Sequence, residues 1–224
     1  MGIAIQQQLL ASIKTGAALD AFLDTYSTSF GSNGTDPMHT YLWKECTGTT
    51  GRGTNANRKK WTFSAWVKRH TFGDDYQCIF SQGSGSNGEG FISFDSDDRL
   101  YFGNDGHHNF VNTGDYRFRD SGWYHIMWAV DTAQGSADNR WKIYINGELM
   151  PASTYGSPGI SANGDGYIGK HDEPQHPCIG ARMRHFFASA NPAYPFRGQL
   201  SQVYFYRRST ITTIRFCRNS KWSL

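Results

Sequence analysis

The segment from Gly103 to Phe110 reads GNDGHHNF and gathers side chains that suit hydrogen bonding to the hydroxyl groups of a sugar. Amide and carboxylate oxygens accept such bonds, and a neutral imidazole offers one donor and one acceptor. Phe110 supplies an aromatic face of the kind that covers the apolar side of a pyranose. The candidate carbohydrate-binding residues are Asn104, Asp105, His107, His108 and Asn109. A solvated loop without a ligand is the alternative interpretation.

A second segment, HDEPQHPC, carries side chains of the types that bind zinc. The candidate ligands are His171, Asp172, His176 and Cys178, all within eight residues. Two prolines and the absence of a second ligand pair favour an ordinary exposed loop instead. No Gly-x-Ser-x-Gly elbow marks a Ser-His-Asp hydrolase.

Basic residues crowd the end of the chain. Arg207, Arg208, Arg215, Arg218 and Lys221 fall within fifteen residues, with Tyr206, Phe216 and Trp222 interleaved. Arginine and aromatic side chains are favoured at protein interfaces, so this segment is expected to dock against an acidic protein neighbour. A nucleic-acid partner is the less favoured alternative, because the net charge of the chain is only +3.

The first 26 residues show a helical pattern, in which Leu9, Leu10 and Ile13 form one apolar face. A short amphipathic helix is marginal in water unless that face is buried. We therefore predict a helical arm over residues 1–26 that mediates assembly. The Gly-, Ser-, Thr- and Asn-rich residues 27–57 favour an irregular connection. The predicted assembly interface comprises Leu9, Leu10, Ile13, Arg207, Arg208 and Arg215.

After Arg58 the pattern changes to a period of two, which places side chains alternately on two faces of a sheet. In WTFSAWVK one face carries Trp61, Phe63, Ala65 and Val67, and the other carries Thr62, Ser64, Trp66 and Lys68. Comparable runs are YQCIFS, GFISFD, RLYF, WYHIMWAV, RWKIYIN and GQLSQVYFY. In YQCIFS the same alternation predicts Cys78 beside Tyr76 and Phe80 on one face. The strand tryptophans Trp66, Trp123 and Trp128 are expected in the core or in an interface.

Turn-forming residues separate these strands, and no helical pattern alternates with them. Asn146-Gly147 indicates a hairpin, because both turn positions need a positive φ. DSDD, from Asp95 to Asp98, indicates another hairpin tip. These signals predict an all-β antiparallel sandwich of the jelly-roll type over residues 58–206, followed by the basic segment 207–224.

Composition sets further limits on the class of protein. Aromatic residues make up 15% of the 224 residues and glycine contributes 25, a balance that suits short strands and tight turns. No run approaches the roughly 18 apolar residues that a membrane helix needs. The start, MGIAIQQQLL, lacks the features of a secretory signal, so export by that route is not expected. The four cysteines are far apart, and we expect reduced thiols.

Three segments resemble the laminin-G-like, concanavalin A-like domain found in structural proteins of tailed bacteriophages. They are NRKKWTFSAWVKR, FISFDSDDRLYF and FRDSGWYHIMWAVDTAQGSADNRWKIYINGE, beginning at Asn57, Phe91 and Phe118. YPFRGQLSQVYF, beginning at Tyr194, is a weaker match. The N-terminal arm lies outside the resemblance, and the basic end departs from it, since family members usually continue with an acidic turn.

The resemblance implies a non-catalytic virion protein, either a capsid decoration or head-fibre subunit or a tail-attached module, assembled in the host cytoplasm. Its partners would be other virion proteins and further copies of the chain. A receptor-binding lectin that recognises host surface glycans during adsorption is the alternative, and the two roles can coexist.

Glycoside hydrolysis ranks third. Enzymes of this fold that cleave β-glucans carry a Glu-x-Asp-x-x-Glu strand, whereas the glutamates here, Glu45, Glu89, Glu148 and Glu173, are too scattered to form one. The resemblance also raises calcium, which rim loops of laminin-G-like domains often bind. The candidate ligands are Asp95, Asp97, Asp98 and Asp105. A tight turn accounts for DSDD locally, so we expect no cofactor to be required.

Overall fold

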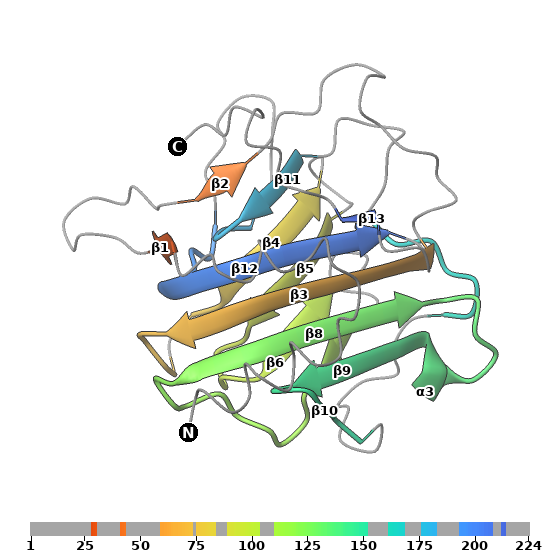
Figure 1. Ribbon diagram of the computed structural model, residues 1–224, viewed down its shortest axis with the longest axis horizontal. Helices are drawn as coiled ribbons and strands as arrows, with labels where there is room; N and C mark the ends of the chain where they lie inside the picture. The colour runs from red at the N-terminus through yellow and green to blue at the C-terminus, as the bar shows by residue number, and fades with distance from the viewer. Residues whose placement is uncertain are drawn as a thin grey trace, which may run out of the picture.

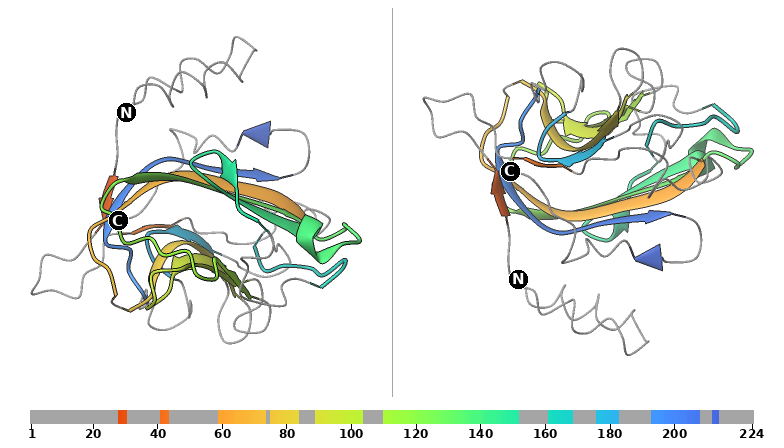
Figure 2. Two further views of the ribbon diagram at one scale, coloured as in Figure 1. Left: turned by 90° about the horizontal axis from the view of Figure 1, so that it is seen from below. Right: turned by 90° about the horizontal axis from the view of Figure 1, so that it is seen from above.

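The fold was determined as a computed structural model, which describes residues 28–30, 41–43, 59–73, 75–83, 89–103, 110–151, 161–168, 176–182, 193–207 and 212–213. Two sheets with antiparallel strand pairing stack face to face as a sandwich (Figures 1 and 2). The predicted all-β antiparallel sandwich is therefore confirmed.

The strands are distributed over the two sheets as follows. The seven-stranded sheet contains, in order, β1 (Thr28–Phe30), β12 (Gly198–Arg207), β3 (Lys60–Arg69), β8 (Trp123–Asp131), β9 (Trp141–Ile145) and β10 (Glu148–Leu149), with β13 (Thr212–Thr213) beside β12. The six-stranded sheet contains β2 (Leu42–Trp43), β11 (His176–Ile179), β4 (Gln77–Gly83), β5 (Glu89–Phe94), β6 (Leu100–Gly103) and β7 (Phe110–Asn112). The one helix in the described part of the chain is α3 (Ala137–Arg140).

The long strands of the seven-stranded sheet bury alternate side chains. In β3 the inward residues are buried and the outward residues are partly exposed, as the period of two predicts. β8 and β9 show the same alternation over their central residues. The inward side chains of both sheets form the main core, in which Phe102 packs on Trp61 and Trp128 at ring centroid distances of 5.3 and 4.9 Å. Each such ring contributes about 1.5–3 kcal/mol by leaving water.

Both predicted hairpin turns are confirmed. Asn146 and Gly147 have φ values of 53° and 86° and join β9 to β10. At the β5–β6 turn Asp98 has a φ of 65°, and its N–H donates to the Asp95 carbonyl at 3.0 Å. The Asp95 carboxylate also accepts bonds from the backbone N–H groups of Asp97 and Arg99, which is the local bonding expected of aspartate in a turn.

The prediction for Cys78 was partly wrong. A bulge in β4 between Cys78 and Phe80 breaks the alternation. Phe80 therefore lies in the main core, while Cys78 and Tyr76 belong to a second apolar cluster with Phe91. One extra residue in a strand reverses the side-chain direction beyond it, and this effect is not visible in a run of apolar residues.

Short strands also occur where the sequence favoured irregular structure. β1 and β2 lie within residues 27–57, and β11 begins in the segment interpreted as an exposed loop. Strands of two to four residues are too short to show a period of two. Among the described residues, Pro177 in β11 pairs with Gln82 of β4 alone, because the pairing between β11 and β2 covers Cys178 and Ile179. A proline is tolerated where a strand has no neighbour on one side.

Candidate functional site

The outward side chains of β3, β8 and β9 form a partly exposed surface in the middle of the seven-stranded sheet. We call this surface the aromatic face and define it as Ser64, Trp66, Trp123, His125, Met127 and Tyr144. The register places Trp66 opposite His125 and Ser64 opposite Met127. Met127 in turn lies opposite Tyr144. Directly opposed residues are close enough to contact, and Trp123 lies two residues before His125 on the same face of β8, so the six side chains lie in one patch.

The centre of the aromatic face is a contact between a tryptophan, a histidine and a serine. The Trp66 and His125 ring centroids are 5.2 Å apart, with the rings tilted by 46°. Ser64 Oγ and His125 Nε2 form a hydrogen bond of 2.9 Å. Burial lowers the pKa of His125, which favours the neutral ring at physiological pH. The three side chains therefore hold one another in place without a charge.

The β9–β10 turn helps to position His125. The Asn146 side-chain oxygen accepts the His125 backbone N–H at 2.9 Å, and the Asn146 N–H donates to the His125 carbonyl at 2.8 Å. Asn146 adopts the positive φ that the turn requires. It thus also fixes the backbone of His125 beneath the aromatic face. The Asn146-Gly147 signal predicted the turn, but it did not predict this second role.

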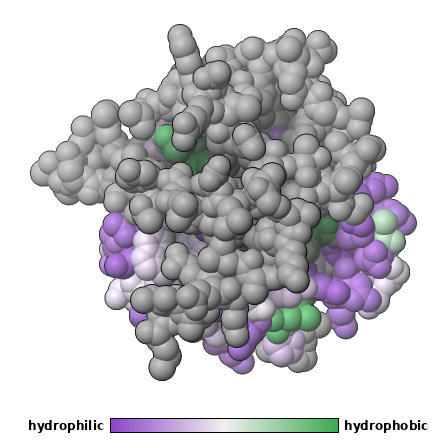
Figure 3. Space-filling model, viewed as in Figure 1, coloured by the Kyte–Doolittle hydropathy of each residue, from purple (hydrophilic) through white to green (hydrophobic). Residues whose placement is uncertain are grey.

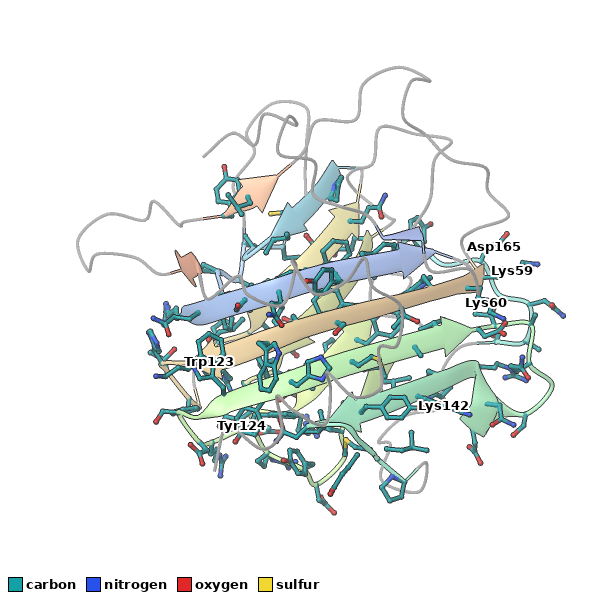
Figure 4. The ribbon with its side chains drawn as sticks, viewed as in Figure 1. Lys59, Lys60, Trp123, Tyr124, Lys142 and Asp165 are labelled. Atoms are coloured by element: carbon teal, nitrogen blue, oxygen red, sulfur yellow. The ribbon has the colours of Figure 1, made fainter. Side chains whose placement is uncertain are left out.

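Charged residues lie at the two ends of the aromatic face. Lys68 stands opposite Trp123 at one end, and Trp123 is 37% exposed. At the other end Lys60 forms an ion pair of 2.9 Å with Asp131, and Lys142 lies two residues from Tyr144. Figure 4 shows Trp123 at one end of the sheet and Lys60 and Lys142 toward the other. Hydrophilic residues also gather along that second end in Figure 3.

The Ser64–His125 pair does not have the surroundings of a hydrolase site. A catalytic histidine is oriented by a third group, and the tetrahedral intermediate needs backbone N–H donors. Within the described ranges no carboxylate bonds to His125. Both residues also sit in regular strands whose ladders occupy neighbouring N–H groups. The pair therefore fits a structural role in the face better than nucleophilic catalysis.

Three of the four aspartates proposed as calcium ligands form ion pairs with arginines. Asp95 and Asp97 both contact Arg99, at 2.6 and 3.0 Å. Asp98 is fully buried and contacts Arg69 at 3.0 Å and Arg119 at 2.8 Å. A calcium ion would have to displace these cations. The fourth candidate, Asp105, lies outside the described residues.

Asp98 and Arg69 form the main polar contact inside the sandwich. Burial alone would raise the pKa of Asp98, but the Gly73 N–H, Arg119 and Arg69 together outweigh it and hold the pKa below its usual value. Burial lowers the pKa of Arg69, and Asp98 opposes that effect. Arg69 also donates to the Phe118 carbonyl at 2.9 Å. This network joins the end of β3, the β5–β6 turn and the loop before β8.

A second buried ion pair lies on the outer side of the six-stranded sheet. Arg182 pairs with Glu89, and its guanidinium lies 4.0 Å from the centroid of the Phe91 ring. Arg182 also forms a two-way backbone bridge with Ala193. The side chains of Arg182 and Tyr194 therefore cover part of this side of the sheet. The sequence alone did not indicate that Glu89 pairs with Arg182, because the two residues are 93 positions apart.

Several predicted residues cannot be placed. The carbohydrate candidates Asn104, Asp105, His107, His108 and Asn109 lie outside the described residues, as do Leu9, Leu10, Ile13, Arg208 and Arg215. Arg207 ends β12, where its backbone pairs with Thr212. Gly103 and Phe110 flank the carbohydrate segment and pair with each other. Their pair lies toward the same end of the six-stranded sheet as the pair of Gly83 and Glu89.

The zinc candidates are not brought together. Cys178 is fully buried in β11, and burial raises its pKa to about 12. His176 pairs with Gly83 at the start of the same strand, while His171 and Asp172 lie outside the described residues. Where the structure describes the chain, no three His, Cys, Asp or Glu side chains are arranged to hold a metal ion. Cys78 and Cys178 are both buried and unpaired. In the same residues, no helix is long and apolar enough to cross a membrane.

A family model described as the concanavalin A-like lectin/glucanases superfamily, of the third laminin G type, matches residues 47–211. The chain belongs to this superfamily. The match covers all the long strands and the whole aromatic face. Among curated protein sequences, none matches this chain.

Solved structures show the same fold at low sequence identity. Domains LG4-5 of the mouse laminin α1 chain align with a TM-score of 0.53 and 11% identity over 84% of this chain, which spans 43% of that protein. The CBM40 of the Ruminococcus gnavus IT-sialidase, bound to α2,6 sialyllactose, aligns with a TM-score of 0.50 and 13% identity. The alignment covers 82% of this chain and 92% of that domain. The binding domain of botulinum neurotoxin DC, in complex with rat synaptotagmin II, aligns with a TM-score of 0.51 and 13% identity. The alignment covers 82% of this chain and 40% of that protein.

Proposed function

We propose that the chain is a non-catalytic binding module and that the aromatic face is its binding surface. The main observation in support is an uncharged patch of tryptophan, tyrosine, methionine and histidine on the outward side of a sheet. Side chains on such a side are usually polar. Aromatic residues and methionine are enriched at interfaces and depleted on ordinary surfaces. The similar structures are solved with a glycan in one case and a protein in another, so the fold leaves the class of partner open.

The state of the carboxylates supports a non-catalytic role. Glycoside hydrolysis needs two carboxyl groups facing one sugar at a defined separation. Glu89, Asp95 and Asp98 are each held by an arginine, and Asp131 by Lys60. We expect no release of reducing sugar from β-glucans. If the wild type releases reducing sugar and substitution of an aspartate or glutamate abolishes that release, this part of the proposal is contradicted.

We further propose that the module belongs to a bacteriophage particle, as a capsid decoration, head-fibre or tail-attached protein. The support is the resemblance of the segments around Trp61, Phe91 and Trp123 to domains in phage structural proteins. The test is an immunoblot of particles purified on a density gradient, with cryo-electron microscopy to find the position. Absence from purified particles would refute this proposal and leave the binding module intact.

The lectin role is the second candidate, favoured by the aromatic rings and the hydrogen-bonding groups of Ser64 and His125. A glycan array probed with the whole chain tests it. Binding that Trp66→Ala weakens, and that Tyr116→Ala leaves unchanged, would place the sugar on the aromatic face. Tyr116 is a suitable control because it is 41% exposed and lies outside that face.

A further inference from the structure

Three residues of the aromatic face form a square with Lys68 at one end of the seven-stranded sheet. Trp66 and Lys68 are successive outward residues of β3, and they lie opposite His125 and Trp123 of β8. Side chains two residues apart on a strand are separated by about 7 Å, and those on neighbouring strands by about 5 Å. The square is comparable in size to one sugar ring. We call these four residues the Lys68–Trp123 site.

Trp123 provides the accessible ring of the Lys68–Trp123 site. It is 37% exposed, whereas the other three side chains are partly buried. It begins β8, so its indole stands at the end of the sheet (Figure 4). An indole presents a large apolar face and suits contact with a ligand that is apolar on one side and polar at its edges. A pyranose ring is such a ligand.

Lys68 provides a positive charge that has no counter-charge in the fold. It takes part in none of the ion pairs among the described residues, whereas five other cations there do: Lys60, Arg69, Arg99, Arg119 and Arg182. An apolar partner that covered Lys68 would bury an uncompensated charge, which costs free energy. A ligand with a negative charge would instead form a charge-assisted hydrogen bond with the ammonium group.

His125 provides a hydrogen-bonding group in a fixed position. Its Nε2 bonds to Ser64 Oγ at 2.9 Å, and the Trp66 ring packs against the imidazole at a centroid distance of 5.2 Å. Its Nδ1 bonds to no group in the part of the chain that the structure describes. Burial lowers the pKa of His125, so the ring is neutral and Nδ1 can exchange a hydrogen bond with a sugar hydroxyl.

The charges around Lys68 limit the ligand to one negative group. Its outward neighbours on β3, β8 and β12 are Trp66, Trp123 and Gln199, none of which is charged. Asp120, three residues before Trp123, accepts the Gly122 N–H at 2.6 Å. A polyanion is held by a row of cations along its charges, and a single lysine is not such a row. A small ligand with one carboxylate fits better.

We infer that the Lys68–Trp123 site binds a pyranose that carries one carboxylate, as the terminal acidic sugar of a glycan does. This inference rests on the proposed function, because it takes the aromatic face as the binding surface, and it adds the class of ligand. The sugar ring stacks on Trp123, and its carboxylate accepts hydrogen bonds from the Lys68 ammonium group. A hydroxyl group of the sugar bonds to His125 Nδ1.

The test is a glycan array probed with the full chain, in which each glycan that ends in a uronic or sialic acid stands beside its carboxyl-reduced form. We expect the wild type to bind the acidic forms about tenfold more strongly, as one charge-assisted hydrogen bond allows. Lys68→Gln should remove this preference, and Lys68→Arg should retain it. Trp123→Ala should weaken binding of both forms.

Lys142→Gln is the matched control. Lys142 is also a partly exposed, outward-facing lysine of the same sheet, and it forms no ion pair among the described residues. This variant should bind the acidic glycans as the wild type does. A thermal melt of each variant confirms that it is folded.

Equal binding of the acidic and reduced forms by the wild type would overturn the inference, and so would a preference that survives in Lys68→Gln. Sulfated glycans form a separate arm of the array. Binding that rises with the number of sulfates, and that Lys142→Gln weakens as much as Lys68→Gln, would overturn the inference in favour of general attraction of polyanions.

Failure of the proposed function has a different signature. If a protein or a neutral glycan binds and Trp66→Ala weakens that binding, the aromatic face is the binding surface although the preference for an acidic sugar is refuted. If Trp66→Ala leaves all binding unchanged, the face is not the binding surface and the proposed function itself fails.

Discussion

Asp98 is a buried aspartate that forms ion pairs with two arginines in the described sandwich. Two arginines and the Gly73 N–H converge on its carboxylate, and its side chain is completely buried. The sequence predicted Asp98 as a turn residue, which is correct but incomplete. Its partners Arg69 and Arg119 lie 29 and 21 residues away, and only the sheet register brings them together.

Removing the charge of Asp98 should therefore destabilise the fold. We expect Asp98→Asn to lower the free energy of unfolding by about 3 kcal/mol or more, because it leaves the buried Arg69 without its counter-charge. Asp97→Asn is the matched control, since the Asp97 side chain is 58% exposed, and its effect should stay within about 0.5 kcal/mol. Urea unfolding monitored by tryptophan fluorescence measures both. Equal midpoints for the two variants would contradict this account.

The same carboxylate predicts a dependence on pH. The pKa of Asp98 is lower in the folded protein than the value of about 3.9 for an unperturbed aspartate. Its stabilising contribution is therefore complete above that value and is lost as the pH falls through the folded pKa. Unfolding free energy should fall below pH 4 more steeply in the wild type than in Asp98→Asn. Parallel curves would show that Asp98 does not contribute.

Calcium is expected to be unnecessary. The aspartates of the β5–β6 turn already bond to Arg99, Arg69 and Arg119, so no ligand set stands open there. Excess EDTA should change the melting temperature by less than about 1 °C, because an ion that binds the native state would otherwise stabilise it by mass action. A drop of several degrees would instead indicate a calcium site that the described residues do not reveal.

At the scale of the element, the long strands were predictable and the short ones were not. β3, β8 and β9 each hold five or more residues with regular alternation, so the outward position of Trp66 could be predicted. Its contact with His125 could not, because that contact depends on pairing two strands about 60 residues apart. The β4 bulge and the strands β1, β2 and β11 leave no periodic signal at all.

The β9–β10 turn offers a test of local backbone chemistry. Gly147 has a φ of 86° and open space around its Cα, so Gly147→Ala introduces strain without a clash. We expect a loss of about 1 kcal/mol, or about 2–4 °C in melting temperature. Gly135→Ala also enters open space, without a positive φ, and should be close to neutral. Similar losses for both would mean that φ is not the cause.

For the molecule as a whole, the two sheets have different surroundings. On the outer side of the six-stranded sheet, Arg182 and Tyr194 cover Phe91 and Tyr76, and Arg182 pairs with Glu89. The aromatic face of the seven-stranded sheet remains partly exposed and uncharged. The contrast favours the seven-stranded sheet as the contact surface. The carbohydrate candidates in residues 104–109 remain a separate prediction at one end of the six-stranded sheet.

The predicted N-terminal arm, residues 1–26, can be tested by deletion. The arm is predicted to serve assembly, so a chain lacking residues 1–26 should keep a cooperative thermal transition while its incorporation into particles falls. A deletion that abolishes the transition would show that the sandwich depends on the arm. Normal incorporation would transfer the docking role to the basic segment 207–224.

The most direct test of the aromatic face as the binding surface is the copy number of face variants in the particle. The variant is Trp66→Ser with Trp123→Ser, and the control is Tyr116→Ser, an exposed aromatic outside the face. Quantitative mass spectrometry of purified particles, beside a thermal melt of each free protein, gives the result. We predict that the double variant melts within a few degrees of the control but falls about tenfold in copy number, a loss of about 1.4 kcal/mol in binding. Wild-type copy number for the double variant would contradict the account.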